Sequence, residues 1–196
     1  MSNPKRILLL GPHKRRLIDF FLEKGCDVSL SEAPLDYSVS SLDNIDFLIS
    51  YGYRHIINRE IVDKFGCRAI NLHCSLLPWN RGADPNLWSF LENSPKGVTI
   101  HCIDYGLDTG KILAQREICF ESPETLRSSY EKLSFAIEEL FMEKWDDICN
   151  ERLVPVPQPL GGSYHLSKDL IPFSYLLTKG WETPVVELIG KGKKVI

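Results

Sequence analysis

The residue types best suited to chemistry lie between positions 71 and 108. Asn71 and His73 occur in one apolar segment, and Asp108 follows another, at residues 98–104. An amide can hydrogen-bond a developing oxyanion, an imidazole can move a proton near neutral pH, and a carboxylate can hold and charge that imidazole. This set favours acyl transfer by direct attack, with no covalent intermediate on the protein.

The residues around this set resemble the folate-dependent formyltransferase family. The family pattern is Asn-x-His-x-Ser-Leu-Leu-Pro, followed by a distant Asp in an Asp-x-Gly-type loop. Here residues 71–78 read NLHCSLLP and residues 108–110 read DTG. The resemblance covers roughly residues 1–125 and places Asn71, His73 and Asp108 at the family's catalytic positions.

The resemblance also implies where two ligands would bind. The co-substrate 10-formyltetrahydrofolate is expected between the segment at 51–57 and the loop at 106–110, and the amine acceptor near the residues that follow the catalytic His. The expected folate-binding residues are Tyr53, Arg54, Ile56, Ile57, Asp104, Gly106 and Leu107, and the expected acceptor-binding residues are Ser75, Trp79 and Arg81.

Residues 79–88 distinguish between branches of the family. Arg81-Gly82 resembles the transfer-RNA and sugar branches, and Pro85-Asn86-x-Trp88 resembles enzymes that act on amino-sugar nucleotides. The pattern is therefore closest to sugar N-formyltransferases. It implies formyl transfer to a primary amine, with a nucleotide-linked amino sugar as the favoured acceptor.

Other functions stay open. A phosphoribosylglycinamide formyltransferase of purine biosynthesis fits the chain length, but its glycine-rich phosphate loop is replaced here by His13-Lys-Arg-Arg16. These cations could meet a phosphate at a helix N-terminus or form a solvated helix start. A formyltetrahydrofolate hydrolase uses a related set of residues. A folate-binding protein without activity is the non-enzyme alternative, and the intact set of Asn, His and Asp argues against it.

Composition narrows the class of protein and its partners. The 196 residues are 43% apolar and 25% charged, which is typical of a globular chain. The net charge of −3 gives no support to nucleic-acid binding, and no apolar run approaches a membrane span. The six cysteines show no metal-type spacing, so we expect no metal and reduced thiols in a cytoplasmic protein.

Apolar segments and helical repeats alternate along the chain and predict the fold. The expected class is α/β, with a Rossmann-like formyltransferase core and a mostly parallel sheet covered by helices on both faces. We expect a catalytic domain over 1–150, and a linker and extension over 151–196 that pack on the core or on a second subunit of a possible homodimer. Strands are predicted at 5–11, 27–31, 45–50, 68–73, 98–104 and 111–120, and helices at 14–24, 58–65, 84–92 and 123–149, the last with Ser122 as its N-cap.

Overall fold

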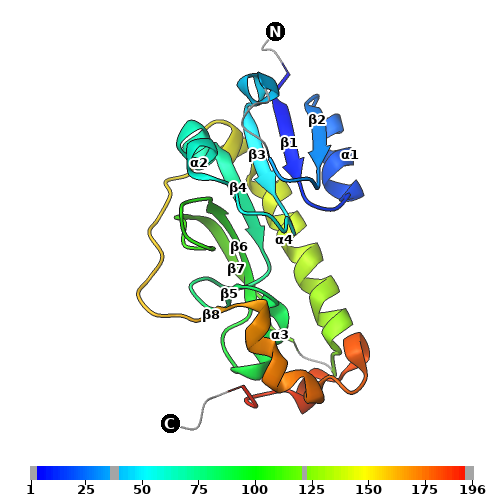
Figure 1. Ribbon diagram of the computed structural model, residues 1–196. Coiled ribbons are helices and arrows are strands. Elements are labelled where there is room, and N and C mark those ends of the chain that lie inside the picture. Colours follow the sequence, from blue (N-terminus) through cyan, green and yellow to red (C-terminus); the bar gives the residue numbers. More distant parts are fainter. Residues whose placement is uncertain (1–3, 36–39, 121–122, 193–196) are drawn as a thin grey trace.

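A six-stranded sheet forms the centre of the molecule (Figure 1). The structure is a computed structural model that describes residues 4–35, 40–120 and 123–192. The strand order is β2-β1-β3-β4-β6-β7. The strands are β1 (Arg6–Leu10), β2 (Asp27–Ser31), β3 (Phe47–Ser50), β4 (Ala69–His73), β6 (Gly97–Cys102) and β7 (Ile112–Glu117).

The sheet is parallel over its first four strands. β1 pairs in parallel with β2 and β3, and β3 with β4, whereas β6 is antiparallel to both β4 and β7. Strands that are buried on both faces read as nearly continuous apolar runs, as residues 7–10 and 47–49 do. The prediction of a mostly parallel α/β sheet is confirmed.

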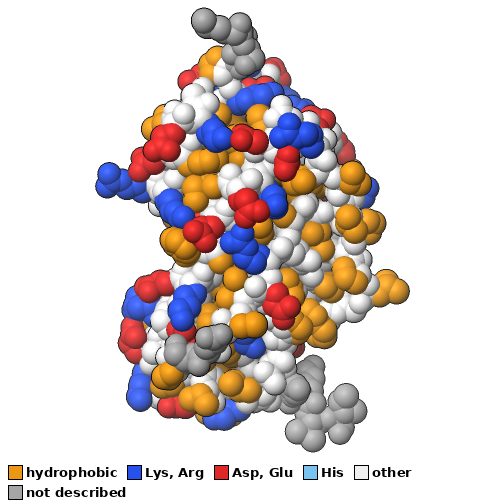
Figure 2. Space-filling model, turned by 180° about the vertical axis from the view of Figure 1, so that it is seen from behind, with side chains coloured by type: hydrophobic (Ala, Val, Ile, Leu, Met, Phe, Trp, Pro, Cys, Tyr) orange, Lys and Arg blue, Asp and Glu red, His pale blue; other side chains and the backbone are white. Residues whose placement is uncertain are grey.

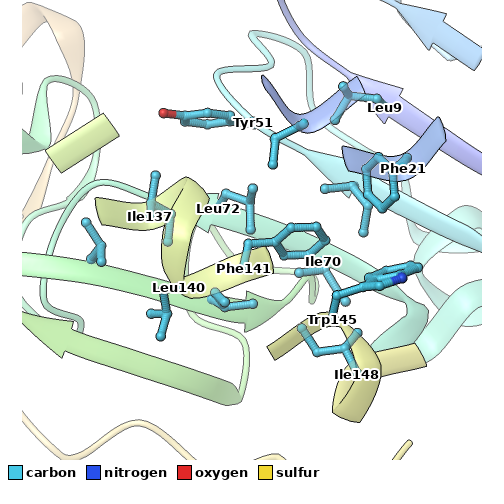
Figure 3. Packing of buried hydrophobic residues seen from close by; sticks show 14 of the residues in the cluster. Leu9, Phe21, Tyr51, Ile70, Leu72, Ile137, Leu140, Phe141, Trp145 and Ile148 are labelled. Carbon is cyan, nitrogen blue, oxygen red and sulfur yellow. The ribbon is translucent and has the colours of Figure 1, made fainter. Parts of the chain in front are cut away.

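Helices cover both faces, because successive strand residues point to opposite sides. Ile7 and Leu9 share a core cluster with α1 (Arg15–Glu23) and α4 (Leu126–Cys149). Leu8 and Leu10 pack instead with α2 (Arg59–Phe65). Figure 3 shows the larger cluster, in which aromatic side chains of α1 and α4 meet the apolar face of β4.

The helix α4 begins later than the sequence predicts. Its N-cap is Thr125, whose hydroxyl accepts from the Ser128 N–H, while the Ser128 hydroxyl accepts from the Thr125 N–H. The predicted cap, Ser122, lies outside the described residues. With 24 residues, the helix extends about 36 Å along the sheet.

After α4 the chain returns along the outside of the molecule (Figure 1). Residues 153–163, here called the strap, pair with β7 through Val156 and Ile112. A small second sheet follows, in which β5 (Arg81–Gly82) pairs in parallel with β8 (Tyr164–His165). Beyond β8, three 3₁₀ helices (Ser167–Leu176, Gly180–Glu182, Val185–Glu187) pack against α3 (Pro85–Leu91) and the start of α4.

Two cysteines depart from the expectation of reduced thiols. Cys67 lies in the turn after α2 and Cys102 ends β6, and the two form a disulfide with their Cα atoms 4.8 Å apart. They meet because β6 lies beside β4, the strand that follows the turn. Their separation of 35 residues gave no signal for this pairing. Cys26, Cys74, Cys119 and Cys149 are free.

The surface mixes charges of both signs. Figure 2 shows Lys and Arg side chains interspersed with Asp and Glu side chains over one face, with apolar side chains between them. Within the described residues, no helix is long and apolar enough to cross a membrane.

Candidate active site

The alternation of β4 places Asn71 and His73 on one face. Ile70 and Leu72 point into the cluster under α4, so Asn71 and His73 point to the opposite side of the sheet. In the neighbouring strand, His101 is paired with Asn71. An amide and two imidazoles are therefore gathered near the ends of β4 and β6.

Asp108 completes this group from the loop between β6 and β7. Its Oδ1 accepts a hydrogen bond from Asn71 Nδ2 at 3.0 Å, and its Oδ2 accepts from the Gly82 N–H at 2.8 Å. The nearest imidazole atoms are His73 Nδ1, 3.6 Å from Oδ2, and His101 Nε2, 3.5 Å from Oδ1. Asp108 has a φ of +54°, in the left-handed region. The three residues predicted to be catalytic thus lie together in the fold.

Hydrogen-bond partners indicate where the imidazole protons are. His101 Nδ1 lies 2.9 Å from the Cys102 carbonyl oxygen and must donate to it, so its Nε2 accepts from Asn71 Nδ2 at 3.2 Å. His73 Nε2 lies 3.1 Å from the Asn80 carbonyl oxygen and donates to it. In a neutral His73, the lone pair is therefore on Nδ1, the atom that faces the carboxylate.

Burial and neighbouring charge act against each other in the site. Burial by itself raises the pKa of Asp108, but the positive charges that His73 and His101 carry when protonated, together with the Gly82 N–H, outweigh it and hold that pKa well below its usual range. Burial lowers the pKa of His73, and the opposing effect of Asp108 is smaller. As expected, Asp108 raises the pKa of His73, but burial lowers that pKa by more, so the net shift is downward. At neutral pH a carboxylate anion lies beside a neutral imidazole.

This arrangement can remove a proton from a nucleophile. His73 can accept the proton on Nδ1, and Asp108 would then stabilise the imidazolium through Oδ2. Both N–H groups of the Asn71 amide are directed at Asp108 Oδ1 and His101 Nε2. One of them must be redirected for Asn71 to donate to an oxyanion.

The residues predicted to contact the acceptor have different surroundings. Ser75 is 2% exposed and its hydroxyl donates to the Trp79 carbonyl oxygen at 2.7 Å, so it shapes the loop after β4. The Trp79 side chain is exposed. Arg81 is partly exposed and donates from Nε to Gln158 Oε1 and from Nη2 to the Gly161 carbonyl oxygen.

The residues predicted to bind folate fall into two groups. Tyr53 and Ile57 pack against the α2 cluster, and the Tyr53 hydroxyl donates to the Ala33 carbonyl oxygen at 2.7 Å. Arg54 is exposed. Asp104 Oδ1 accepts from the Gly106 N–H at 3.1 Å, which fixes the turn before Asp108. The structure therefore brings Asp104 and Gly106 close to the site and uses Tyr53 and Ile57 largely for packing.

Apolar surface remains on these two loops. Ile56 is 91% exposed, Tyr105 61% and Leu107 48%. Tyr105 contacts the start of α2, where the Arg59 guanidinium lies 4.3 Å from the centroid of the Tyr105 ring. Exposed apolar and aromatic side chains beside a polar centre are suited to a flat heteroaromatic ligand.

A cavity of about 670 Å³ opens between the strap and the loop that carries Asp108. Arg81 and Asp104 line it, together with Thr109, Lys111 and the disulfide. Its volume is in the range of small-molecule sites. Of the residues predicted to bind ligands, only Arg81 and Asp104 line this cavity.

Three contributors to the site were not predicted from the sequence. They are the Gly82 N–H, the Asn80 carbonyl oxygen and the side chain of Gln158. The first two are main-chain atoms in the Trp79–Gly82 segment, where the sequence pointed to the Trp79 and Arg81 side chains and not to the main chain. Gln158 lies in the proline-rich strap, where no periodicity marks a functional residue.

The basic residues after β1 have protein partners. Lys14 Nζ lies 4.2 Å from the centroid of the Tyr51 ring, Arg15 pairs with Asp19, and Arg16 pairs with two glutamates of α4. These contacts favour the interpretation of a solvated, ion-paired helix start over a phosphate site. In the described part of the chain, no group of three or more His, Cys, Asp or Glu side chains is placed to hold a metal ion.

The sequence profile of the family described as Formyl transferase matches residues 23–144. The dTDP-4-amino-4,6-dideoxyglucose formyltransferase of Mycobacterium bovis is 32% identical over 144 residues, which are 74% of this chain and 58% of that protein. The methionyl-tRNA formyltransferase of Thermodesulfovibrio yellowstonii is 42% identical over 118 residues, 59% of this chain and 38% of that protein. This chain thus spans less than two thirds of the length of either relative.

Solved structures give a more complete likeness. The crystal structure of the formyltransferase PseJ from Anoxybacillus kamchatkensis, in complex with UDP-4,6-dideoxy-4-formamido-L-AltNAc and tetrahydrofolate, has a TM-score of 0.93. It is 56% identical in sequence, and the match covers 96% of this chain and 100% of that chain. A 4-N formyltransferase from Francisella tularensis has a TM-score of 0.71 at 27% identity, covering 84% of this chain and 77% of the other.

Proposed function

Because the chain belongs to the formyl transferase family, we propose that it moves a formyl group from 10-formyltetrahydrofolate to a primary amine on a nucleotide-linked amino sugar. The observation that carries this proposal is the likeness to PseJ, at 56% identity over 96% of this chain. PseJ was crystallised with a UDP-sugar that bears a formamido group at carbon 4. The corresponding acceptor for this chain is a UDP-linked 4-amino-4,6-dideoxy sugar.

Bound folate supplies an activated formyl group. When the amine nitrogen forms a bond to the formyl carbon, the bond from that carbon to the folate nitrogen breaks, and one proton passes from the amine to the folate nitrogen. In this proposal His73 Nδ1 takes that proton first, because His73 Nε2 already donates to the Asn80 carbonyl oxygen. Asp108 Oδ2, 3.6 Å away, stabilises the cation that results.

Asn71 has the complementary role in this proposal. Charge develops on the formyl oxygen as the amine attacks, and one Asn71 N–H turns from its ground-state acceptors to that oxygen. Losing such a donor costs about a hundredfold or more in rate. His101 supports this role, because its Nε2 accepts from the same amide and orients it.

The binding roles follow the shape of the site. The exposed Ile56 and Leu107 would cover the flat face of the folate, with Asp104 and Gly106 forming the turn between them and the reacting groups. Arg81, which lines the cavity beside the strap, would meet the phosphates of the acceptor.

A transfer assay read by mass spectrometry tests the proposal. The protein is given 10-formyltetrahydrofolate and a mixture of UDP-linked and dTDP-linked 4-amino sugars together with glycinamide ribonucleotide. We expect a formyl mass increment on a sugar nucleotide, reduced about a hundredfold or more in Asn71→Ala. Formylation of glycinamide ribonucleotide alone would show that the acceptor is this ribonucleotide and not an amino-sugar nucleotide. Release of formate without a formylated acceptor would indicate a hydrolase, and no consumption of folate would contradict the proposal.

A further inference from the structure

The side chain of Gln158 is hydrogen-bonded through both of its polar atoms inside the site. Its Nε2 donates to the Asp108 carbonyl oxygen at 2.8 Å and to the Gly110 carbonyl oxygen at 2.9 Å. Its Oε1 accepts from Arg81 Nε at 3.2 Å. A primary amide has two N–H donors, and both are given to the loop that carries Asp108.

These contacts close a ring around the carboxylate. Gln158 donates to the main chain of Asp108, and the Asp108 side chain accepts from the Gly82 N–H. Arg81, the residue before Gly82, donates to Gln158 and so completes the ring. The ring joins three segments that are far apart in sequence: the β6–β7 loop, β5 and the strap. Removing the amide would release the main chain of Asp108 and leave Arg81 with its bond to the Gly161 carbonyl oxygen alone.

The loop that carries Asp108 has a backbone conformation that its neighbours must stabilise. Asp108 has a positive φ, a conformation that costs energy for a residue with a side chain. Gly110 is packed so closely that a Cβ atom would lie 1.7 Å from the Cys102 carbonyl oxygen. Asp108 Oδ2 lies 3.6 Å from His73 Nδ1, so a small shift of this loop would change the distance between the carboxylate and the imidazole.

The strap has few other attachments near this point. Val156 pairs with Ile112, and the Gly161 carbonyl oxygen accepts from Arg81 Nη2. Between them, Gln158 is partly buried, whereas Pro157 and Pro159 on either side have no N–H to donate. Its side chain therefore supplies the contact from this stretch of the strap to the loop.

We propose that Gln158 is a positioning residue for the reaction, which holds Asp108 at the distance from His73 that the proton transfer requires. It acts through Asp108 and touches neither reacting group. Only the kinetic part of this inference rests on the proposed function, because the position of Asp108 can also be measured without turnover.

The test replaces Gln158 with Met, which keeps the length and removes all three hydrogen bonds. The first readout is the titration of the His73 imidazole, followed by NMR in histidine-labelled protein. Asp108 and His101 are the titratable groups that face His73. If the carboxylate moves away, its stabilisation of the imidazolium weakens, and the midpoint should fall by about half a pH unit or more.

The second readout is kcat in the transfer assay. A displacement of a catalytic group by about 1 Å can cost about a hundredfold, so we expect a loss of about 10- to 100-fold in Gln158→Met. Gln158→Glu keeps an oxygen acceptor for Arg81 but no N–H donors, and it should not restore the rate. Val154→Ala, which alters an 80% exposed side chain of the strap, is the matched control and should leave both readouts unchanged.

The outcomes separate positioning from a structural role. A lower His73 midpoint and a lower kcat in Gln158→Met, with a melting temperature close to that of Val154→Ala, would support the proposal. An unchanged midpoint in a folded variant would overturn it, whatever the rate. If the wild-type protein formylates no amine, the proposed function fails, and the titration still decides the role of Gln158.

Discussion

On one face of β4, Asn71 and His73 lie beside Asp108, and both carboxylate oxygens have close polar partners. On the opposite face, Cys74 and Tyr51 are buried in the apolar cluster under α4, and the Tyr51 hydroxyl makes no hydrogen bond of normal geometry with the described residues. On both faces, burial disfavours the charged form of a titratable side chain. It raises the pKa of Cys74 to about 12 and also raises that of Tyr51, yet Asp108 stays ionised. Whether a buried side chain is charged here therefore depends more on its hydrogen-bonding and charged neighbours than on how deeply it is buried.

The largest expected effect comes from removing the charge of the Asp108 carboxylate. Asp108→Asn keeps the size of the side chain but puts an N–H₂ donor in place of one of the two oxygens that now accept hydrogen bonds. The imidazolium form of His73 loses its partner, so we expect kcat in the transfer assay to fall about a thousandfold. A loss below tenfold in a folded variant would show that the carboxylate is not needed for the proton transfer.

The second effect is a dependence of rate on pH. His73 must be neutral to accept a proton, and burial lowers its pKa below the ordinary value of about 6.5. With saturating acceptor, kcat should therefore hold at pH 6.5 and decline only below it, approaching about tenfold per pH unit. In Asp108→Asn the midpoint should move to still lower pH, since the Asp108 charge favours the protonated form.

A control distinguishes His73 from the acceptor amine in that profile. Protonation of the amine also reduces the rate in acid, but in kcat/KM its midpoint is the pKa of the free amine, which no residue of the protein changes. A kcat/KM midpoint that is identical in wild type and in Asp108→Asn would assign the decline to the acceptor. It would remove His73 as the titrating group.

The smallest effect is expected on the apolar face. Cys74 is the thiol nearest to Asn71 and His73 in sequence, but its raised pKa keeps it protonated and unreactive at neutral pH. Cys74→Ala should leave the transfer rate within a few-fold of wild type. A loss of several hundredfold without unfolding would contradict direct transfer and point to an acyl-enzyme, which intact-protein mass spectrometry would detect.

The elements of the fold were predictable where a local pattern sets them. The period of two along a strand is enough to place Asn71 and His73 on the same face of β4. Asn58, the first residue of the helix predicted at 58–65, caps α2, and its side chain accepts from the Ile61 N–H. Asp84, the first residue of the helix predicted at 84–92, is the N-cap of α3 but makes no capping hydrogen bond and adopts a φ of +51°. For α3, the residue type predicted where the helix begins but not the backbone conformation of its N-cap.

What the sequence could not predict depends on contacts between distant segments. The Gly82 N–H reaches Asp108 because β5 pairs with β8, a strand of two residues with no pattern of its own. Gln158 lies in an extended segment that has neither a helical nor a strand repeat of apolar residues to indicate a function. Cys67 and Cys102 meet through the order of strands in the sheet. In each case the partner is selected by topology, which no local window of the sequence contains.

The disulfide has a consequence for the unfolded chain. It closes a loop from Cys67 to Cys102 that contains Asn71, His73, Arg81 and the whole of α3. With the bond intact, that segment samples fewer conformations when the protein unfolds, and bonds of this kind typically add about 2–4 kcal/mol to the free energy of unfolding. The oxidation state of two sulfur atoms outside the reacting group thus sets how much conformational entropy is lost when the site forms.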